Sequence, residues 1–294
     1  MIGYTSTYIE LNQYMQEAVE LVKDDCIWSE QLYTGTDVPK AVNQNPCKDA
    51  VNAWEKAIAI WSGSIEGPYG RNLSEPGETG KFLQALAEKR CVNYGTCGTA
   101  PQFKDRTKDD VTPRANMGIT ASFEKGRAAI FYGQVGVAKR MISQINKDLT
   151  ISRIQGVMRY AYRMGRPENK SKKDKEIAEG AAFALGVLPQ IYACNKSSAA
   201  IIAQNMQIGG EYTTQTNGKF VNFANVRAAL ECNYPCLGIR FSDIGSLNDC
   251  EEDGTDDKTL CFGAKKDKGN ICKSPFSKKF KKKWYIPTHY YFLV

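Results

Sequence analysis

Ten cysteines limit what this 294-residue chain can fold into. They form no Cys-x-x-Cys pair and are spread over the whole chain: Cys26, Cys47, Cys91, Cys97, Cys194, Cys232, Cys236, Cys250, Cys261 and Cys272. The one histidine is His289, so the clustered Cys and His ligands of a structural zinc site are missing. An even number of dispersed cysteines favours disulfides, and therefore a secreted, periplasmic or cell-surface protein. A cytosolic protein with buried, reduced thiols is the alternative.

The rest of the composition indicates a folded protein that does not bind nucleic acid. Hydrophobic residues make up 42% of the chain and charged residues 24%, which is typical of globular proteins. The net charge of +7 comes largely from two lysine-rich runs, residues 170–175 and 278–283, and not from one basic face. No zinc finger and no RNA-recognition motif occurs. Sequons at Asn72, Asn169 and Asn195 permit N-glycosylation, so we expect a glycoprotein.

Apolar residues recur with helical spacing along most of the chain, and we expect an all-α fold. Two of the expected helices contain residues that disturb a helix. Four glycines divide or bend the helix expected over 115–149. Pro189 kinks or ends the apolar, buried helix expected over 176–193. The remaining helices are expected at residues 8–23, 49–61, 81–90, 151–164, 198–206 and 220–232.

The chain divides into three parts. Residues 1–245 form the helical domain, with possible halves 1–150 and 151–245. Residues 246–277 are a Cys-rich appendage, and residues 278–294 are a basic and then aromatic tail. Residues 53–60 and 178–185 share a pattern of small and apolar residues, and a turn with Cys and Tyr follows each. We therefore expect two pseudo-repeated helical halves with a central cleft.

Most kinds of catalytic site are missing from the sequence. A nucleophilic triad needs a base, usually histidine, and the glycines form no phosphate-binding loop. A pair of carboxylates of the glycosidase type is left open. Glu55 and Glu179 lie among apolar residues of expected helices, where a carboxylate needs a cation, hydrogen bonds or a metal. Glu66 and Asp243 lie in turns, where Asp243 can also cap a helix.

A second group of candidates lies in residues 154–163. At helical spacing Arg159 and Tyr162 share a face, whereas Tyr160 points elsewhere. An arginine beside a tyrosine and carboxylates can hold a small anion next to a hard cation. The alternative is that these tyrosines are core aromatic residues.

Five segments, in order, resemble the low-iron-inducible periplasmic protein family of algae. They are Ala53 to Gly67 (AWEKAIAIWSGSIEG), Arg90 to Cys97 (RCVNYGTC), Ile154 to Tyr162 (IQGVMRYAY), Ala178 to Phe183 (AEGAAF, with Leu188-Pro189), and Tyr234 to Gly245 (YPCLGIRFSDIG). The resemblance covers roughly residues 45 to 250. Members of the family take part in iron assimilation, and related diatom phytotransferrins in carbonate-dependent ferric uptake. The appendage and the tail lie outside the resemblance.

The resemblance implies an extracellular or periplasmic protein that binds Fe(III) for uptake, with carbonate as a possible synergistic anion and a membrane transporter or cell-surface component as a possible partner. Fe(III) prefers hard oxygen ligands, and the oxygen donors in the matching segments are Glu55, Glu66, Tyr94, Tyr162, Glu179 and Asp243. Arg159 is the candidate for the anion. We expect no catalysis. The alternatives are a structural or adhesive cell-surface protein without a metal site, and an extracellular hydrolase that uses a carboxylate pair.

Overall fold

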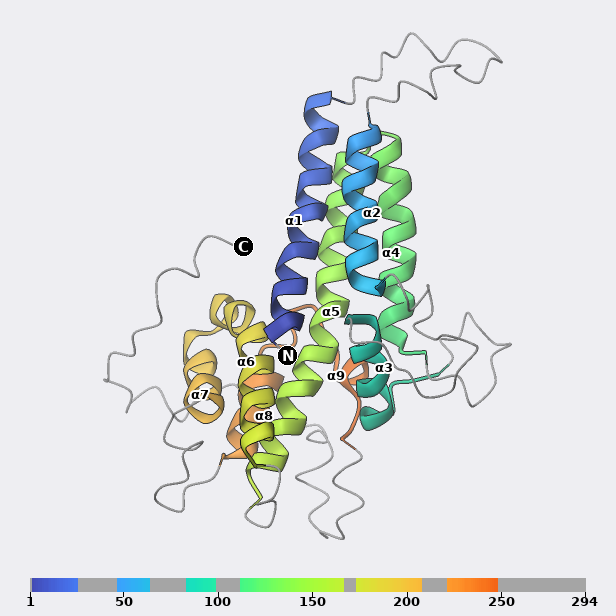
Figure 1. Cartoon of the computed structure of the whole chain (residues 1–294). Coiled ribbons are helices and arrows are strands. Elements are labelled where there is room, and N and C mark those ends of the chain that lie inside the picture. Colours follow the sequence, from blue (N-terminus) through green and yellow to red (C-terminus); the bar gives the residue numbers. More distant parts are fainter. Residues whose placement is uncertain are drawn as a thin grey trace, which may run out of the picture. The chain divides into compact units, whose positions relative to one another are not determined.

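The computed structural model describes residues 2–25, 47–63, 83–98, 112–166, 173–207 and 221–247. Most residues in these ranges are helical and none of them is in a β-strand, which confirms the predicted helical class (Figure 1). The tail at 278–294 and all of the Cys-rich appendage after Leu247 lie outside the described residues.

Nine helices make up the described ranges. They are α1 (Ile2–Asp25), α2 (Lys48–Ser62), α3 (Leu83–Tyr94), α4 (Arg114–Phe131), α5 (Val135–Met164), α6 (Lys173–Cys194), α7 (Lys196–Met206), α8 (Phe223–Glu231) and α9 (Phe241–Ile244). The helices expected at residues 8–23, 49–61, 81–90, 176–193, 198–206 and 220–232 each have a counterpart, with ends that differ by up to six residues.

One boundary among the predicted helices is wrong. The helix over 115–149 does divide, since α4 ends before Gly133, which has a φ of 67°. No further break follows, however, because α5 continues to Met164 where a separate helix was expected from residue 151. Of the two outcomes predicted for Pro189, a kink or an end of the helix, the end does not occur, because α6 continues to Cys194. Gly63, with a φ of 78°, ends α2.

The chain forms two compact units, which we describe separately. Unit 1 contains Lys89–Val111 and Thr150–Val294, together with the first five residues. Unit 2 contains Ser6–Glu88 and Thr112–Leu149. The boundaries fall within helices, since α3 divides after Glu88 and α5 after Leu149.

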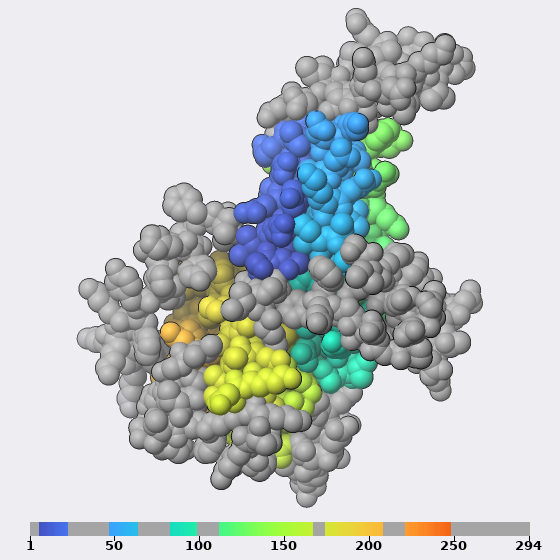
Figure 2. All heavy atoms as spheres, viewed as in Figure 1, coloured from blue at the N-terminus to red at the C-terminus, as the bar shows by residue number. Residues whose placement is uncertain are grey.

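In unit 2, tryptophans hold the helices together. The apolar stripe of α1 is buried, and α1 lies beside α2 (Figure 2). Trp54 of α2 is fully buried and its indole Nε1 donates to the carbonyl oxygen of Phe123 at 3.0 Å. Gly126 lets the two helices approach, because a Cβ there would meet the Trp54 ring at under 3.0 Å. The aromatic side chains thus define how α2 and α4 pack.

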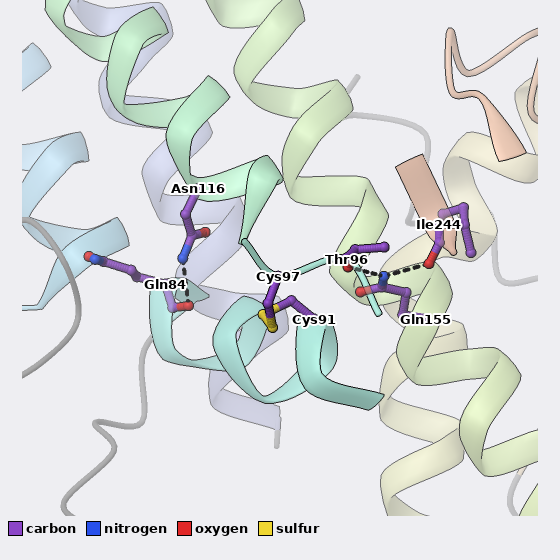
Figure 3. The surroundings of a disulfide bond; sticks show 7 residues. All are labelled: Gln84, Cys91, Thr96, Cys97, Asn116, Gln155 and Ile244. Carbon is purple, nitrogen blue, oxygen red and sulfur yellow. Dashed lines mark hydrogen bonds between the residues drawn. A yellow bond between two sulfur atoms is a disulfide. The ribbon is translucent and has the colours of Figure 1, made fainter. Parts of the chain in front are cut away.

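In unit 1, a buried amide connects α5 to two other segments. Gln155 donates from Nε2 to the Thr96 hydroxyl at 3.2 Å and to the Ile244 carbonyl at 2.8 Å (Figure 3). The hydroxyl of Tyr94 donates to the backbone carbonyl of Gln155 at 2.7 Å. These bonds satisfy polar groups in the interior and hold the end of α3 and the segment around α9 against α5.

Disulfides are present, as the cysteine pattern predicts. Cys91–Cys97 closes the turn after α3 and appears in Figure 3. Cys194–Cys236 joins the end of α6 to the turn after α8. Cys47 is also disulfide-bonded. The cysteines at positions 26, 250, 261 and 272 lie outside the described residues.

By length and composition alone, α6 is the described helix that could cross a membrane. Its Glu176 is buried and forms an ion pair with Arg163 of α5, and its Glu179 accepts a hydrogen bond from Tyr160. One side of α6 therefore packs against the rest of unit 1 through Glu176, Ala181, Phe183, Ala184, Val187 and Ile191, whereas Leu185 on the other side is 54% exposed, so the helix is only partly buried where the sequence predicts a buried one.

Candidate functional site

Two of the predicted metal ligands lie outside unit 1 or outside the described residues. Glu66 falls in the gap between α2 and α3 and is not described. Glu55 belongs to unit 2, where its carboxylate accepts from the Arg127 Nε at 2.8 Å. Both side chains of this pair are about half exposed, at 46% for Glu55 and 55% for Arg127. An exposed pair of this kind contributes little to stability.

Tyr94 and Asp243 hold backbone structure in unit 1. Tyr94 is 1% exposed and its hydroxyl donates to the carbonyl of Gln155, as described above. Asp243 caps α9, since its carboxylate accepts from the backbone N–H of Arg240 at 2.9 Å and from its guanidinium Nη2 at 2.9 Å. The predicted cap is therefore present.

Tyr162 lies on the side of α5 that faces α8. It is buried, its ring packs edge-on against Phe223, and its hydroxyl accepts from the Arg166 guanidinium at 2.7 Å. The charged hydrogen bond from Arg166 and the packing on Phe223 thus hold Tyr162 in place within unit 1.

The remaining two candidates, Glu179 and Arg159, come together around a tyrosine that we did not predict. The Tyr160 hydroxyl donates to the Glu179 carboxylate Oε2, and its ring stacks on Phe183 with centroids 5.5 Å apart. Arg159 is close enough to act on the charge of Tyr160. Tyr160 thus faces α6, whereas the candidates selected from the sequence, Arg159 and Tyr162, lie on other faces of α5.

Small residues make this contact between α5 and α6 possible. A Cβ at Gly156 would meet the Phe183 ring at under 3.0 Å, and a Cβ at Gly180 would lie 3.1 Å from the Cβ of Tyr160. Glycine at both positions lets the aromatic pair fill the space between the helices.

Arginines surround the Tyr160–Glu179 pair. The Arg90 guanidinium lies over the Tyr160 ring at 5.6 Å and over the Phe183 ring at 5.3 Å. Its Nη1 donates to Asn93 at 3.0 Å, but its buried Nε has no hydrogen-bond partner. One turn from the pair, Arg163 donates to Glu176 at 3.1 Å. We call these residues the Tyr160 cluster: Arg90, Arg159, Tyr160, Arg163, Glu176 and Glu179.

Burial and charge act on the tyrosine in opposite directions. Burial raises the pKa of Tyr160 above its ordinary value, and the hydrogen bond to Glu179 raises it further, whereas the positive charges of Arg90 and Arg159 lower it. The phenol is therefore protonated at neutral pH, and a metal ion would have to displace that proton before binding.

The Tyr160 cluster offers hard oxygen donors beside a buried cation. Among the described residues, no group of three or more His, Cys, Asp and Glu side chains is placed to hold a metal ion. In the Tyr160 cluster, the phenol of Tyr160 is the oxygen donor that adds to the carboxylates of Glu176 and Glu179. Glu176 and Glu179 lie one turn apart on α6, and Tyr160 and Arg163 are spaced in the same way on α5. This matched spacing is the signal by which Tyr160, Arg163 and Glu176 could have been found in the sequence.

Comparison with known proteins adds no assignment. No protein-family model, curated protein or solved structure matches the chain.

Proposed function

We propose that the protein binds ferric iron outside the cytosol for iron uptake, without catalysis of its own, and that the Tyr160 cluster holds the metal together with carbonate. One observation carries this proposal: the Tyr160 hydroxyl lies on the Glu179 carboxylate, beneath the Arg90 guanidinium, whose buried Nε has no partner.

The donor chemistry fits Fe(III). Phenolate and carboxylate oxygens are hard ligands. The Tyr160 hydroxyl already donates a hydrogen bond to the Glu179 carboxylate, and a metal ion bound by both oxygens would take the place of that proton. Glu176 lies one turn from Glu179, and its carboxylate becomes a third oxygen donor if its ion pair with Arg163 opens. The other predicted ligands that are described would first have to leave the hydrogen bonds or ion pairs that hold them.

The arginines supply the place for an anion. A guanidinium binds a planar oxyanion through two parallel N–H donors, and a bidentate anion completes the coordination of a metal that has few protein ligands. Arg90 is buried, with an unpartnered Nε, and Arg159 acts on the same tyrosine. We therefore propose both for carbonate, where the sequence indicated only Arg159.

The compartment is supported by the disulfides. Cys91–Cys97 and Cys194–Cys236 would be reduced in most cytosols, so they support a secreted, periplasmic or cell-surface location. The pseudo-repeat, the central cleft and a partner that receives the iron remain proposals from the sequence.

The test is ferric affinity in matched variants. Metal-free protein competes with a chelator for Fe(III) in the presence of bicarbonate, as wild type, as Tyr160→Phe and as Tyr132→Phe. Tyr132 is 55% exposed at the turn after α4 and serves as the control. We expect Tyr160→Phe to lose at least about tenfold in affinity, since it removes a ligand, and Tyr132→Phe to lose nothing. Equal affinity in all three would overturn the assignment to Tyr160.

A further inference from the structure

A pocket of about 280 Å³ lies in unit 1, away from the contacts of the Tyr160 cluster. One face of α8 forms one wall, and α9 with the three residues that follow it forms the other. The volume is just below the usual range of small-molecule sites, so the pocket fits a ligand with one ring.

Three aromatic side chains contribute to the apolar part of the lining, beside Met158, Ile244 and Leu247. Phe223 comes from α8, Tyr234 from the turn after it, and Phe241 from α9. Tyr234 is 1% exposed and its hydroxyl donates to the Met158 sulfur at 3.5 Å. Phe241 is 52% exposed and touches Tyr234 edge-on, with centroids 5.1 Å apart. The rings present faces and edges on which another ring can stack.

A buried ion pair also lines the pocket. Arg227 and Glu231, one turn apart on α8, are joined by a bond of 2.7 Å from Nε to Oε1. Their side chains are only 9% and 6% exposed. Taking both charges out of water costs about as much as their attraction returns, so folding stability alone gives little reason for such a pair. The pair does, however, place a guanidinium and a carboxylate in the wall of the pocket.

We propose that this pocket binds a small zwitterion with one aromatic ring, of the class of the aromatic α-amino acids. The ring would stack among Phe223, Tyr234 and Phe241, with the carboxylate toward Arg227 and the ammonium toward Glu231. Such a ligand adds one charge of each sign to a pair that is already neutral, whereas a ligand with a single charge would leave an excess charge buried. This inference does not depend on the iron proposal.

The experiment is calorimetric titration of the full, metal-free chain in the presence of a chelator, which prevents iron from mediating binding. The probes are L-phenylalanine, 3-phenylpropanoate, phenethylamine and L-alanine. L-phenylalanine carries the ring and both charges. 3-Phenylpropanoate has the ring and only the carboxylate, phenethylamine has the ring and only the ammonium, and L-alanine has both charges without the ring. We expect saturable binding of one L-phenylalanine per chain, at least about tenfold tighter than each of the other three.

Two exposed residues provide matched variants that spare the core. Phe241→Ala removes a ring from the lining, and we expect about a two- to tenfold loss in affinity for L-phenylalanine. Leu185→Ala is the control, because Leu185 is 54% exposed on α6 and does not line the pocket. Absence of saturable binding up to about 10 mM would overturn the proposal. So would tighter binding of either singly charged probe, or equal losses in the two variants.

Discussion

Replacement of Gly245 by alanine tests the packing of the segment after α9. Gly245 has a φ of 76° and a ψ of −164°, a combination that only glycine adopts readily. A Cβ there would lie under 3.0 Å from the Tyr94 carbonyl oxygen and from the Thr96 side chain. The same carbonyl accepts a hydrogen bond from the Ser246 N–H at 3.2 Å, so it cannot move away without cost.

The expected loss of stability has two parts. The unfavourable backbone conformation costs about 1–3 kcal/mol, and the overpacking costs about 1–3 kcal/mol more. Gly245→Ala should therefore destabilise the fold by about 2–6 kcal/mol, a large share of the roughly 5–15 kcal/mol by which proteins are stable.

Gly95 provides the control. It also has a positive φ, of 62°, but no atom lies within 4 Å of a Cβ placed there. Gly95→Ala should cost only the backbone strain, about 1–2 kcal/mol. Urea denaturation of both variants, followed by circular dichroism, gives the two free energies of unfolding. A loss in Gly245→Ala no larger than that in Gly95→Ala would refute the close contact with Tyr94.

Three more predictions follow from buried groups and crosslinks. Burial raises the pKa of Tyr234 well above its ordinary value, so the folded chain keeps a proton that the unfolded chain releases above about pH 10, and stability falls with rising pH in that range. Tyr234→Phe should lose less stability than wild type between about pH 9 and 11 in urea melts, and an equal loss would contradict this. Replacing Cys194 and Cys236 by serine should lower the stability of the fold by on the order of 4 kcal/mol, against about 2 kcal/mol for Cys91 and Cys97. The reason is that the first disulfide joins residues 42 apart and the second joins residues 6 apart. Thermal melts that rank the two variants the other way would contradict this reason. Iron affinity should rise about tenfold per pH unit near neutrality for each proton that binding releases, and so about a hundredfold when a phenol and bicarbonate both lose one; an affinity that is independent of pH would exclude a tyrosine ligand.

The helices could be predicted from the sequence because their signals are local. The stripe of α1 that includes Leu11 and Met15 is buried as its spacing requires, and Gly63 and Gly133 end helices where the chain needs a positive φ. The continuity of α5 through Thr150 and Ile151 also has a local reason, since no glycine or proline interrupts it there.

Pro189 shows where the local rule did not suffice. A proline removes the hydrogen bond to the carbonyl four residues earlier, which belongs to Leu185. Leu185 is 54% exposed, so the interrupted turn lies on the exposed side of α6, and the helix continues past it to Cys194.

The candidate site depended on contacts between helices, which spacing within one helix does not reveal. Arg159 and Glu179 were selected from separate segments, and the residue that connects them, Tyr160, faces α6 only because Gly156 and Gly180 leave room for its ring and for Phe183. Arg90, on a third helix, carried no signal of its own in the sequence.

Visible absorption during ferric titration of the metal-free protein, with and without bicarbonate, tests the central claim most directly. The account predicts a tyrosinate-to-iron charge-transfer band that saturates at one iron per chain, requires bicarbonate and is absent in Tyr160→Phe. Failure to bind iron saturably under either condition would contradict it and favour a structural, cell-surface protein.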